Sequence, residues 1–145
     1  RGYSTRKLLM APLTHNTPKP SHKILKFFPG ITIETIKAVI DSAKGIVIES
    51  FGAGNAPTST ELSALLNTAN KEGKIMLNIT QCLHGSAVDG QYETSEPFGK
   101  AGVISGKDMT TEAAIIKLMF LLGQGLSNAE IKEELQKNIS GEITI

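Results

Sequence analysis

The sequence predicts a three-layer α/β/α domain built on a four-stranded parallel sheet, and two observations carry this prediction. Short apolar runs alternate with stretches of helical apolar spacing, in the order strand then helix four times, with one extra helix at the end. The run at residues 46–48 is β-branched, as in strands buried on both faces, and ends at the glycine turn 52–54. Strands that alternate with helices form a parallel sheet with right-handed crossovers and helices on both faces.

Length and composition are those of a soluble globular domain. The chain has 145 residues, of which 40% are hydrophobic and 20% charged, and its formal net charge is +1. With scattered lysines and no apolar run of membrane-span length, we expect neither nucleic acid nor a membrane as a partner. Cys82 is the single cysteine, so an intrachain disulfide is impossible and we expect a reducing, cytoplasmic location. The start at Arg1 rather than Met suggests a fragment of a longer protein.

The first half of the chain contains an arm, two strands and a helix. Residues 1–22 combine basic residues with three prolines, which predicts a linker or arm from an absent N-terminal domain, whereas residues 23–145 form the domain itself. A first strand is expected at 23–28, followed by a helix that Thr32 caps. The second strand begins at Gly45.

A second helix and a third strand follow the glycine turn. Thr58 and Glu61 have the spacing of a capping box for a helix from about 58 to 72, and Gly73 stands where a C-terminal glycine belongs. Residues 75–79 then form the third strand.

The last part of the chain begins with a long stretch, 81–102, that has no sustained period, which is typical of a functional loop. A short strand at 103–104 leads to a helix over 113–122, for which Asp108 is the expected cap. This helix is apolar almost all round, with Lys117 as its one charged residue, so we expect it to be buried on more than one side, with a second subunit as a candidate cover.

A capping box predicts one more helix near the C-terminus. Ser127 and Glu130 have the required spacing, and Ile131 and Leu135 are expected to face inwards.

Polar side chains that suit a small ligand cluster near the carboxyl ends of the predicted strands, where open parallel sheets bind ligands. They are Asn55, Thr80, Gln81, Tyr92, Ser105 and Asp108. Each also has a structural interpretation: Asn55 as a turn residue, Thr80 as strand packing, and Asp108, where we favour it, as a helix cap.

Known cofactor and metal motifs are missing. The glycine turn is not a dinucleotide fingerprint, because the third glycine position falls near Pro57, and no phosphate loop occurs. The three histidines lack metal-ligand spacing. Cys82 has no motif that would make it a nucleophile, and a buried free cysteine is the commoner case. We therefore expect no cofactor and no metal.

Five segments in order carry a resemblance to a known family. They are Gly52-Ala-Gly-Asn-Ala-Pro57, Asn78-Ile-Thr-Gln-Cys82, Ala101-Gly-Val-Ile-Ser-Gly106, Asp108-Met-Thr-Thr-Glu-Ala113 and Lys117-Leu-Met-Phe-Leu-Leu122. From about Lys23 to the C-terminus the chain resembles the Rossmann-like C-terminal domain of type I (cytosolic, bacterial-like) L-asparaginase.

The resemblance implies a two-domain amidohydrolase that converts L-asparagine to L-aspartate and ammonia without a cofactor. The family's threonine nucleophile lies in a Thr-Gly-Gly-Thr motif of the N-terminal domain, and this sequence has no such motif. We therefore expect no catalytic residue in this fragment and no activity from it alone. The family forms intimate dimers, often paired into tetramers, in which this smaller domain completes the active site.

The resemblance also implies site residues. Asn55 and Tyr92 are the expected substrate-binding residues, with the Tyr92 loop reaching the active site of a neighbouring subunit. Some type I enzymes bind asparagine at a second, allosteric site, to which Glu49, Asn55, Thr80 and Cys82 correspond. Where allosteric members carry an arginine, this chain has Glu49, and a carboxylate cannot pair with the α-carboxylate of the ligand.

Two other functions stay open at this point. One is a non-catalytic α/β module that senses a small polar metabolite, and the other is the asparaginase-like subunit of a transfer-RNA amidotransferase. A preference for asparagine over glutamine cannot be predicted, because its determinants lie mostly in the absent domain.

Overall fold

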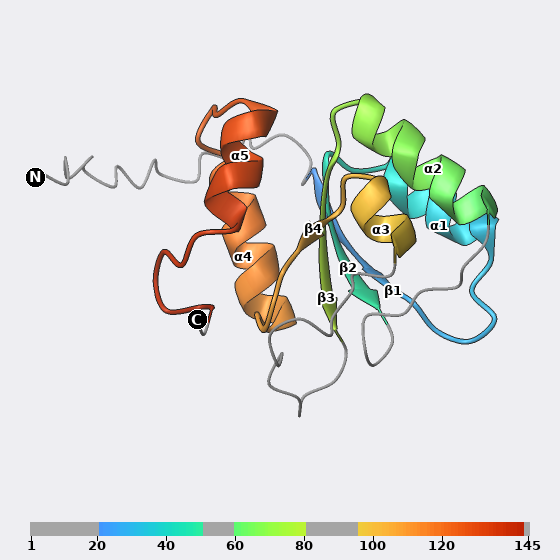
Figure 1. The fold of residues 1–145 in the computed structure, drawn as a ribbon, viewed down its shortest axis with the longest axis horizontal. Helices are drawn as coiled ribbons and strands as arrows, with labels where there is room; N and C mark the ends of the chain where they lie inside the picture. Colours follow the sequence, from blue (N-terminus) through green and yellow to red (C-terminus); the bar gives the residue numbers. More distant parts are fainter. Residues whose placement is uncertain (1–20, 51–59, 81–95, 144–145) are drawn as a thin grey trace, which may run out of the picture.

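The computed structural model describes residues 21–50, 60–80 and 96–143, which form four strands and five helices (Figure 1). In chain order they are β1 (His22–Lys26), α1 (Ile33–Asp41), β2 (Gly45–Ser50), α2 (Thr60–Lys71), β3 (Ile75–Thr80), α3 (Glu96–Lys100), β4 (Ile104–Ser105), α4 (Thr111–Leu122) and α5 (Asn128–Leu135). The predicted alternation of strands with helices, with an extra helix at the end, is confirmed.

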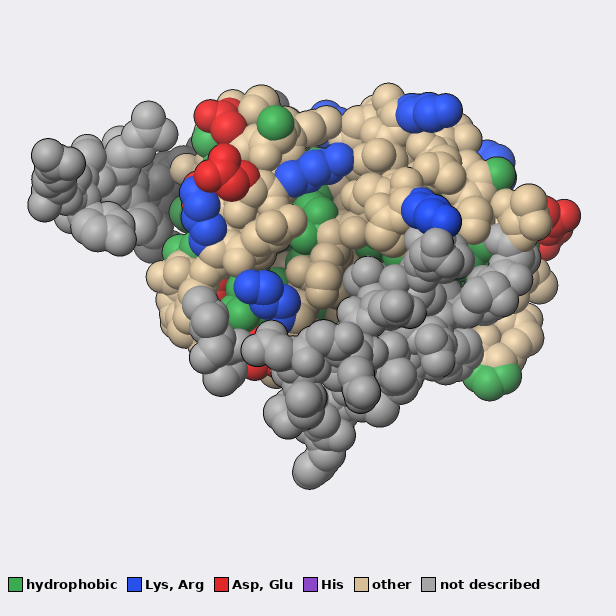
Figure 2. Space-filling model, in the orientation of Figure 1, with side chains coloured by type: hydrophobic (Ala, Val, Ile, Leu, Met, Phe, Trp, Pro, Cys, Tyr) green, Lys and Arg blue, Asp and Glu red, His purple; other side chains and the backbone are tan. Residues whose placement is uncertain are grey.

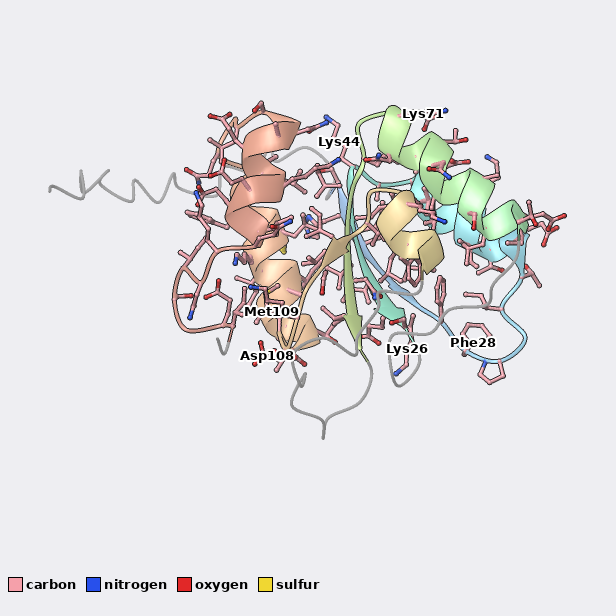
Figure 3. All side chains as sticks on the ribbon, viewed as in Figure 1. Lys26, Phe28, Lys44, Lys71, Asp108 and Met109 are labelled. Atoms are coloured by element: carbon pink, nitrogen blue, oxygen red, sulfur yellow. The ribbon has the colours of Figure 1, made fainter. Side chains whose placement is uncertain are left out.

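The four strands form one parallel sheet in the order β1-β2-β3-β4. Gly45 of β2 pairs with His22 of β1 and with Ile75 of β3, so these three strands start level with one another. All carboxyl ends therefore meet at one edge of the sheet, which Lys26 and Asp108 mark in Figure 3, whereas Lys44 lies at the opposite edge.

Helices cover both faces of the sheet, with α1, α2 and α3 on one face and α4 and α5 on the other (Figure 1). Because side chains alternate along a strand, β2 serves both cores. Ile46 and Ile48 are buried under α1–α3, and Val47 is buried under α4. The prediction of a strand buried on both faces and of a three-layer domain is confirmed.

Local sequence signals set several helix ends as expected. The Thr32 hydroxyl accepts a hydrogen bond from the Thr35 N–H at the start of α1. Gly73 has φ 83° directly after α2, a conformation that favours glycine. Ser127 and Glu130 form the full capping box of α5, while Thr58 of the other predicted box lies outside the described residues.

Two expectations were wrong. The stretch 81–102 was expected to be a loop throughout, but α3 lies within it, and a helix of five residues is too short to show a helical period. The N-cap of α4 is Thr110, which accepts from the Ala113 N–H, rather than Asp108. The chain first makes a turn in which the Met109 N–H donates to the Gly106 carbonyl, and this turn places Asp108 before the helix.

The helix α4 packs one side against the sheet and α5 and leaves the other side open in the single chain. Ala114, Leu118 and Leu121 are buried, whereas Ile116 is 64% exposed and lies beside the exposed Phe120. None of the described helices combines the length and apolarity that a membrane crossing requires.

Candidate functional site

The carboxyl edge of the sheet brings together the ends of β1, β2 and β3 and the start of α4. In the sheet register, Glu49 lies between Lys26 of β1 and Ile79 of β3, and Ser50 lies beside Thr80. The ends of β1, β2 and β3, which are far apart in sequence, are therefore neighbours in space, and two of the predicted site residues, Glu49 and Thr80, lie on them.

Glu49 is held by residues of its own chain on the face that α4 covers. Its side chain is 13% exposed, and the Thr111 hydroxyl donates to Oε1 at 2.5 Å. The Lys26 ammonium lies 3.8 Å from Oε2. The Glu49 carboxylate thus ties the end of β2 to the first turn of α4, where a negative charge is also favoured by the helix dipole.

Ser50 at the end of β2 and Asn78 near the end of β3 lie on the other face of the sheet, and both are buried. The Ser50 hydroxyl donates to the Ile79 carbonyl at 3.2 Å. Asn78 is 6% exposed, and its Oδ1 is a buried acceptor with no partner among the residues that the structure describes. Such groups are rare in folded proteins and call for an explanation.

Of the predicted site residues, Glu49 is the one whose side chain the structure describes. Thr80 is the last residue of β3, and its backbone pairs with Ser50. Asn55, Tyr92 and Cys82, as well as the side chain of Thr80, lie outside the described part, so the structure does not test whether these residues come together. Of the other polar candidates, Gln81 also lies outside this part, while Ser105 and Asp108 are exposed near this edge.

Asn78 was missed as a candidate, although the sequence contains a signal for it. It is the one amide within the otherwise apolar run Ile75-Met-Leu-Asn-Ile79. A polar residue at a buried strand position is more informative than an exposed apolar one.

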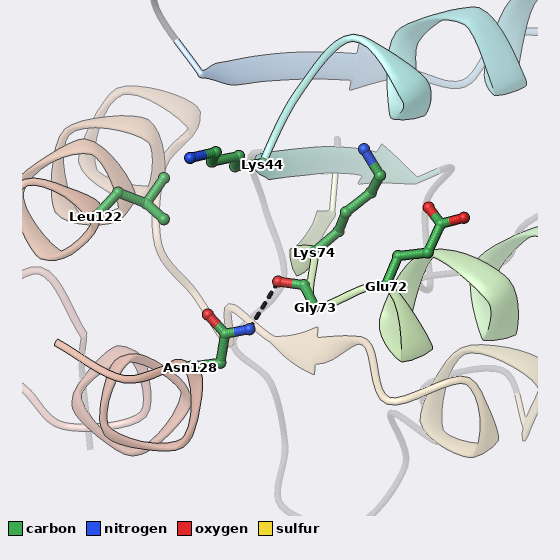
Figure 4. A pocket seen from close by; sticks show the side chains of 6 residues that line it. All are labelled: Lys44, Glu72, Gly73, Lys74, Leu122 and Asn128. Atoms are coloured by element: carbon green, nitrogen blue, oxygen red, sulfur yellow. Dashed lines mark hydrogen bonds between the residues drawn. The ribbon is translucent and has the colours of Figure 1, made fainter. Parts of the chain in front are cut away.

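A cavity of about 330 Å³ lies at the opposite, amino-terminal edge of the sheet (Figure 4). Lys74 lines it, but its ammonium donates to the carbonyls of Ile40 and Ala43 at 2.8 and 2.7 Å. Asn128 lines it too, and its Nδ2 donates to the Gly73 carbonyl at 2.8 Å. These polar groups stabilise the connections between elements, and parallel sheets bind ligands at the other edge, so we do not take this cavity as the functional site.

The charges of the described surface do not point to a metal or to a polyanionic partner. Within residues 21–50, 60–80 and 96–143, no group of three or more histidine, cysteine, aspartate or glutamate side chains could hold a metal ion. Figure 2 shows lysine side chains spread singly over the face in view rather than gathered into one patch.

Comparison with known proteins extends these observations. Residues 23–135 match the model of the glutaminase/asparaginase C-terminal domain. The chain is 33% identical to L-asparaginase 1 of Escherichia coli (strain K12) over 153 aligned positions, which cover 99% of this chain and 45% of that protein. It is 39% identical to the 60 kDa lysophospholipase of Mus musculus over 92% of this chain and 24% of that protein.

Solved structures agree with the sequence comparisons. The crystal structure of L-asparaginase I from Vibrio cholerae superposes with a TM-score of 0.79 at 42% identity, over 89% of this chain and 39% of that chain. The chain spans less than half the length of each of these relatives. Since the family model covers most of the chain, the protein belongs to the glutaminase/asparaginase C-terminal domain family.

Proposed function

We propose that this chain is the C-terminal domain of an L-asparaginase that hydrolyses L-asparagine to L-aspartate and ammonia. The observation that carries the proposal is the family match over residues 23–135, supported by the likeness to an L-asparaginase I structure at 42% identity. In this proposal, residues 1–22 lead in from an N-terminal catalytic domain. That domain supplies the threonine nucleophile, because no Thr-Gly-Gly-Thr motif occurs in this sequence.

The domain's role is to complete an active site rather than to perform the chemistry. The proposed enzyme works in the cytoplasm as a homodimer or a dimer of dimers, and needs no metal or organic cofactor. Asn55 and Tyr92 are the proposed substrate-binding residues, and Tyr92 reaches the active site of a neighbouring subunit. A phenol suits this task, because its ring excludes water and its hydroxyl can donate to a carboxylate.

The test compares the 145-residue chain with the intact protein in a coupled assay for ammonia release from L-asparagine. We expect activity from the intact protein and none above the buffer control from this chain. Ammonia release by the chain alone would overturn the assignment of the nucleophile to another domain. An intact protein that folds but releases no ammonia from asparagine or glutamine would overturn the proposed function.

A second experiment tests the role of Tyr92. In the intact enzyme, Tyr92→Phe removes one hydrogen bond to a charged ligand group, which is worth about 1.5–3 kcal/mol, so we expect kcat/KM to fall roughly ten- to hundredfold. Fold and oligomeric state should not change. Kinetics equal to the wild type would leave the tyrosine with a packing role only.

Lysophospholipid hydrolysis is a second candidate, favoured by the 39% identity to the mouse protein that bears the name lysophospholipase. The same protein preparation should be assayed for fatty-acid release from a lysophospholipid. Fatty-acid release without ammonia release would favour this candidate over the first.

A further inference from the structure

The outer edge of β1 is an open sheet edge in the described part of the chain. β1 is the first strand in the sheet order, and its partner among the described residues is β2. The Phe27 N–H, directly after β1, donates to the Glu49 carbonyl of β2 at 2.9 Å. Backbone groups alternate in direction along an extended strand, so the N–H and C=O groups of Ile24 and Lys26 point away from β2. They form a row of donors and acceptors that another strand can pair with.

Ile24 gives this edge an apolar centre. Because Leu25 lies in the core under α1–α3, the side chain of Ile24 lies on the face that α4 covers. Although α4 contacts β1, Ile24 is still 46% exposed. An exposed isoleucine on an edge strand favours pairing, whereas charged residues usually protect such strands from it.

Met119 of α4 lies beside the same edge. Leu118 packs against Gly45 of β2, and Lys117 faces the C-terminal segment. Because successive residues of a helix differ in direction by about 100°, Met119 lies on the flank of α4 opposite Lys117, which is the flank towards β1. Met119 is 43% exposed. The apolar side chains of an added strand would therefore pack against Ile24 and Met119.

The charged residues around β1 are mostly basic. Lys23 and Lys26 are exposed, and Lys44, whose backbone N–H donates to the Ser21 carbonyl, lies at the amino end of the strand. Lys26 lies 3.8 Å from Glu49, but its side chain stays 64% exposed. Like charges on paired strands are destabilising, so β1 is a poor match for β1 of a second copy and a good match for an acidic strand.

We propose that the outer edge of β1 binds an extended segment of another protein in which acidic and apolar residues alternate. The backbone of the segment pairs with the outward N–H and C=O groups of Ile24 and Lys26 and extends the parallel sheet by one strand. Its apolar side chains lie against Ile24 and Met119, and its acidic side chains lie on the other face, beside Lys23. The inference goes beyond the proposed function and does not depend on it.

The test measures binding to the 145-residue chain by the fluorescence anisotropy of a labelled peptide of about seven residues, in which glutamate and valine alternate. One control peptide carries lysine in place of glutamate. The other keeps the acidic sequence but has methyl groups on successive central backbone nitrogens, so its side chains are unchanged and neither of its edges can donate there. We expect saturable binding of the acidic peptide, at least about tenfold tighter than that of either control.

Two variants locate the binding on β1. Lys23→Glu reverses the charge beside the acidic side chains, so we expect the acidic peptide to bind about fivefold more weakly and the lysine peptide to bind more tightly. Ile24→Thr keeps a β-branched side chain but removes apolar contact, and we expect binding about threefold weaker. Lys71→Glu makes the same charge change at an exposed position on α2 and should bind as the wild type does.

The absence of saturable binding by the acidic peptide would overturn the proposal. Equal binding of the lysine peptide would do so too, because charge would then not select the partner. Equal binding of the methylated peptide would show that the backbone edge is not the contact. Loss of self-association in Ile24→Thr would assign the edge to a second copy of this chain, which also contradicts the proposal.

Discussion

Lys117 Nζ lies 2.6 Å from Glu142 Oε1, and this ion pair joins the middle of α4 to the C-terminal segment of the described chain. The two side chains are only 5% and 9% exposed. Lys117 also donates to the Lys137 carbonyl, and the Glu142 carboxylate accepts from the backbone N–H groups of Ile139 and Ser140. Lys117, the one basic residue of α4, is therefore the anchor of the segment that follows α5.

Removing Glu142 should lower the free energy of unfolding more than removing Lys117 does. Glu142→Ala leaves the Lys117 ammonium buried with the Lys137 carbonyl as its remaining partner among the described residues, and we expect it to lower the free energy of unfolding by about 3 kcal/mol. Lys117→Met fits the apolar surroundings and leaves Glu142 with its backbone donors, so we expect a smaller loss of about 1 kcal/mol. Urea unfolding followed by circular dichroism measures both.

Lys137→Met is the control, because that lysine is half exposed and pairs with Glu133 and Glu134 on the surface. No measurable change in stability is expected from it. Losses of equal size in Glu142→Ala and Lys117→Met would contradict the unequal effect.

The same pair predicts an acid-sensitive stability. Burial by itself would raise the pKa of the Glu142 carboxyl, but the Lys117 ammonium and the N–H groups of Ile139 and Ser140 outweigh it and hold this pKa well below its usual value. A carboxyl with a lowered pKa stabilises the fold fully above its unfolded pKa of about 4.3 and loses that contribution as the pH falls towards the folded pKa. We expect Glu142→Gln to be less stable than the wild type at pH 7 and to lose less stability below about pH 4. Thermal unfolding from pH 7 to pH 3 checks this, and parallel curves for both proteins would contradict it.

Substitution by alanine should change stability differently at two glycines near α4, Gly106 and Gly123. A Cβ at Gly106 would lie 2.6 Å from Ile79 Cγ2 and 2.9 Å from the Asn78 backbone oxygen, which cannot move easily because β3 is held in the sheet. We expect Gly106→Ala to cost about 1–3 kcal/mol. Gly123, directly after α4, has ordinary contacts at 3.5 Å and φ −80°, so Gly123→Ala should be neutral or slightly stabilising. Equal midpoints of urea unfolding for the two variants would show that the close approach at Gly106 is relieved at no cost.

The features that sequence predicts well are those set by neighbouring residues. The cap at Thr32, the glycine with positive φ at Gly73 and the capping box of Ser127 and Glu130 all depend on residues within one helical turn. The α/β order could be predicted for the same reason. Thr110 was missed because a turn from Gly106 to Met109 separates Asp108 from α4.

Features that depend on distant residues could not be predicted. The partner of Lys117 lies 25 residues further along the chain (142 − 117), and no local pattern pairs the two side chains. The same holds for Glu49, whose hydrogen bond to Thr111 spans 62 residues and places its carboxylate against α4. The burial of Asn78 could not be predicted either, because it depends on the helices that cover both faces of β3.

The outer side of α4 leads to the last prediction, that the chain self-associates. Ile116, Met119 and Phe120 have the i, i+3, i+4 spacing of one helix face, and all three are exposed in the single chain. A stable interface buries about 800 Å² on each partner, more than three side chains supply, so we expect a weak dimer whose population rises with concentration. Sedimentation velocity over a range of concentrations measures this.

Phe120→Lys should shift the chain to a monomer without unfolding it, because its side chain is already exposed. Phe28→Lys, a similarly exposed phenylalanine after β1, is the matched control and should dimerise as the wild type does. A wild-type monomer at every concentration would contradict the prediction, and so would equal weakening by the two lysine variants, because α4 would then not be the face that associates.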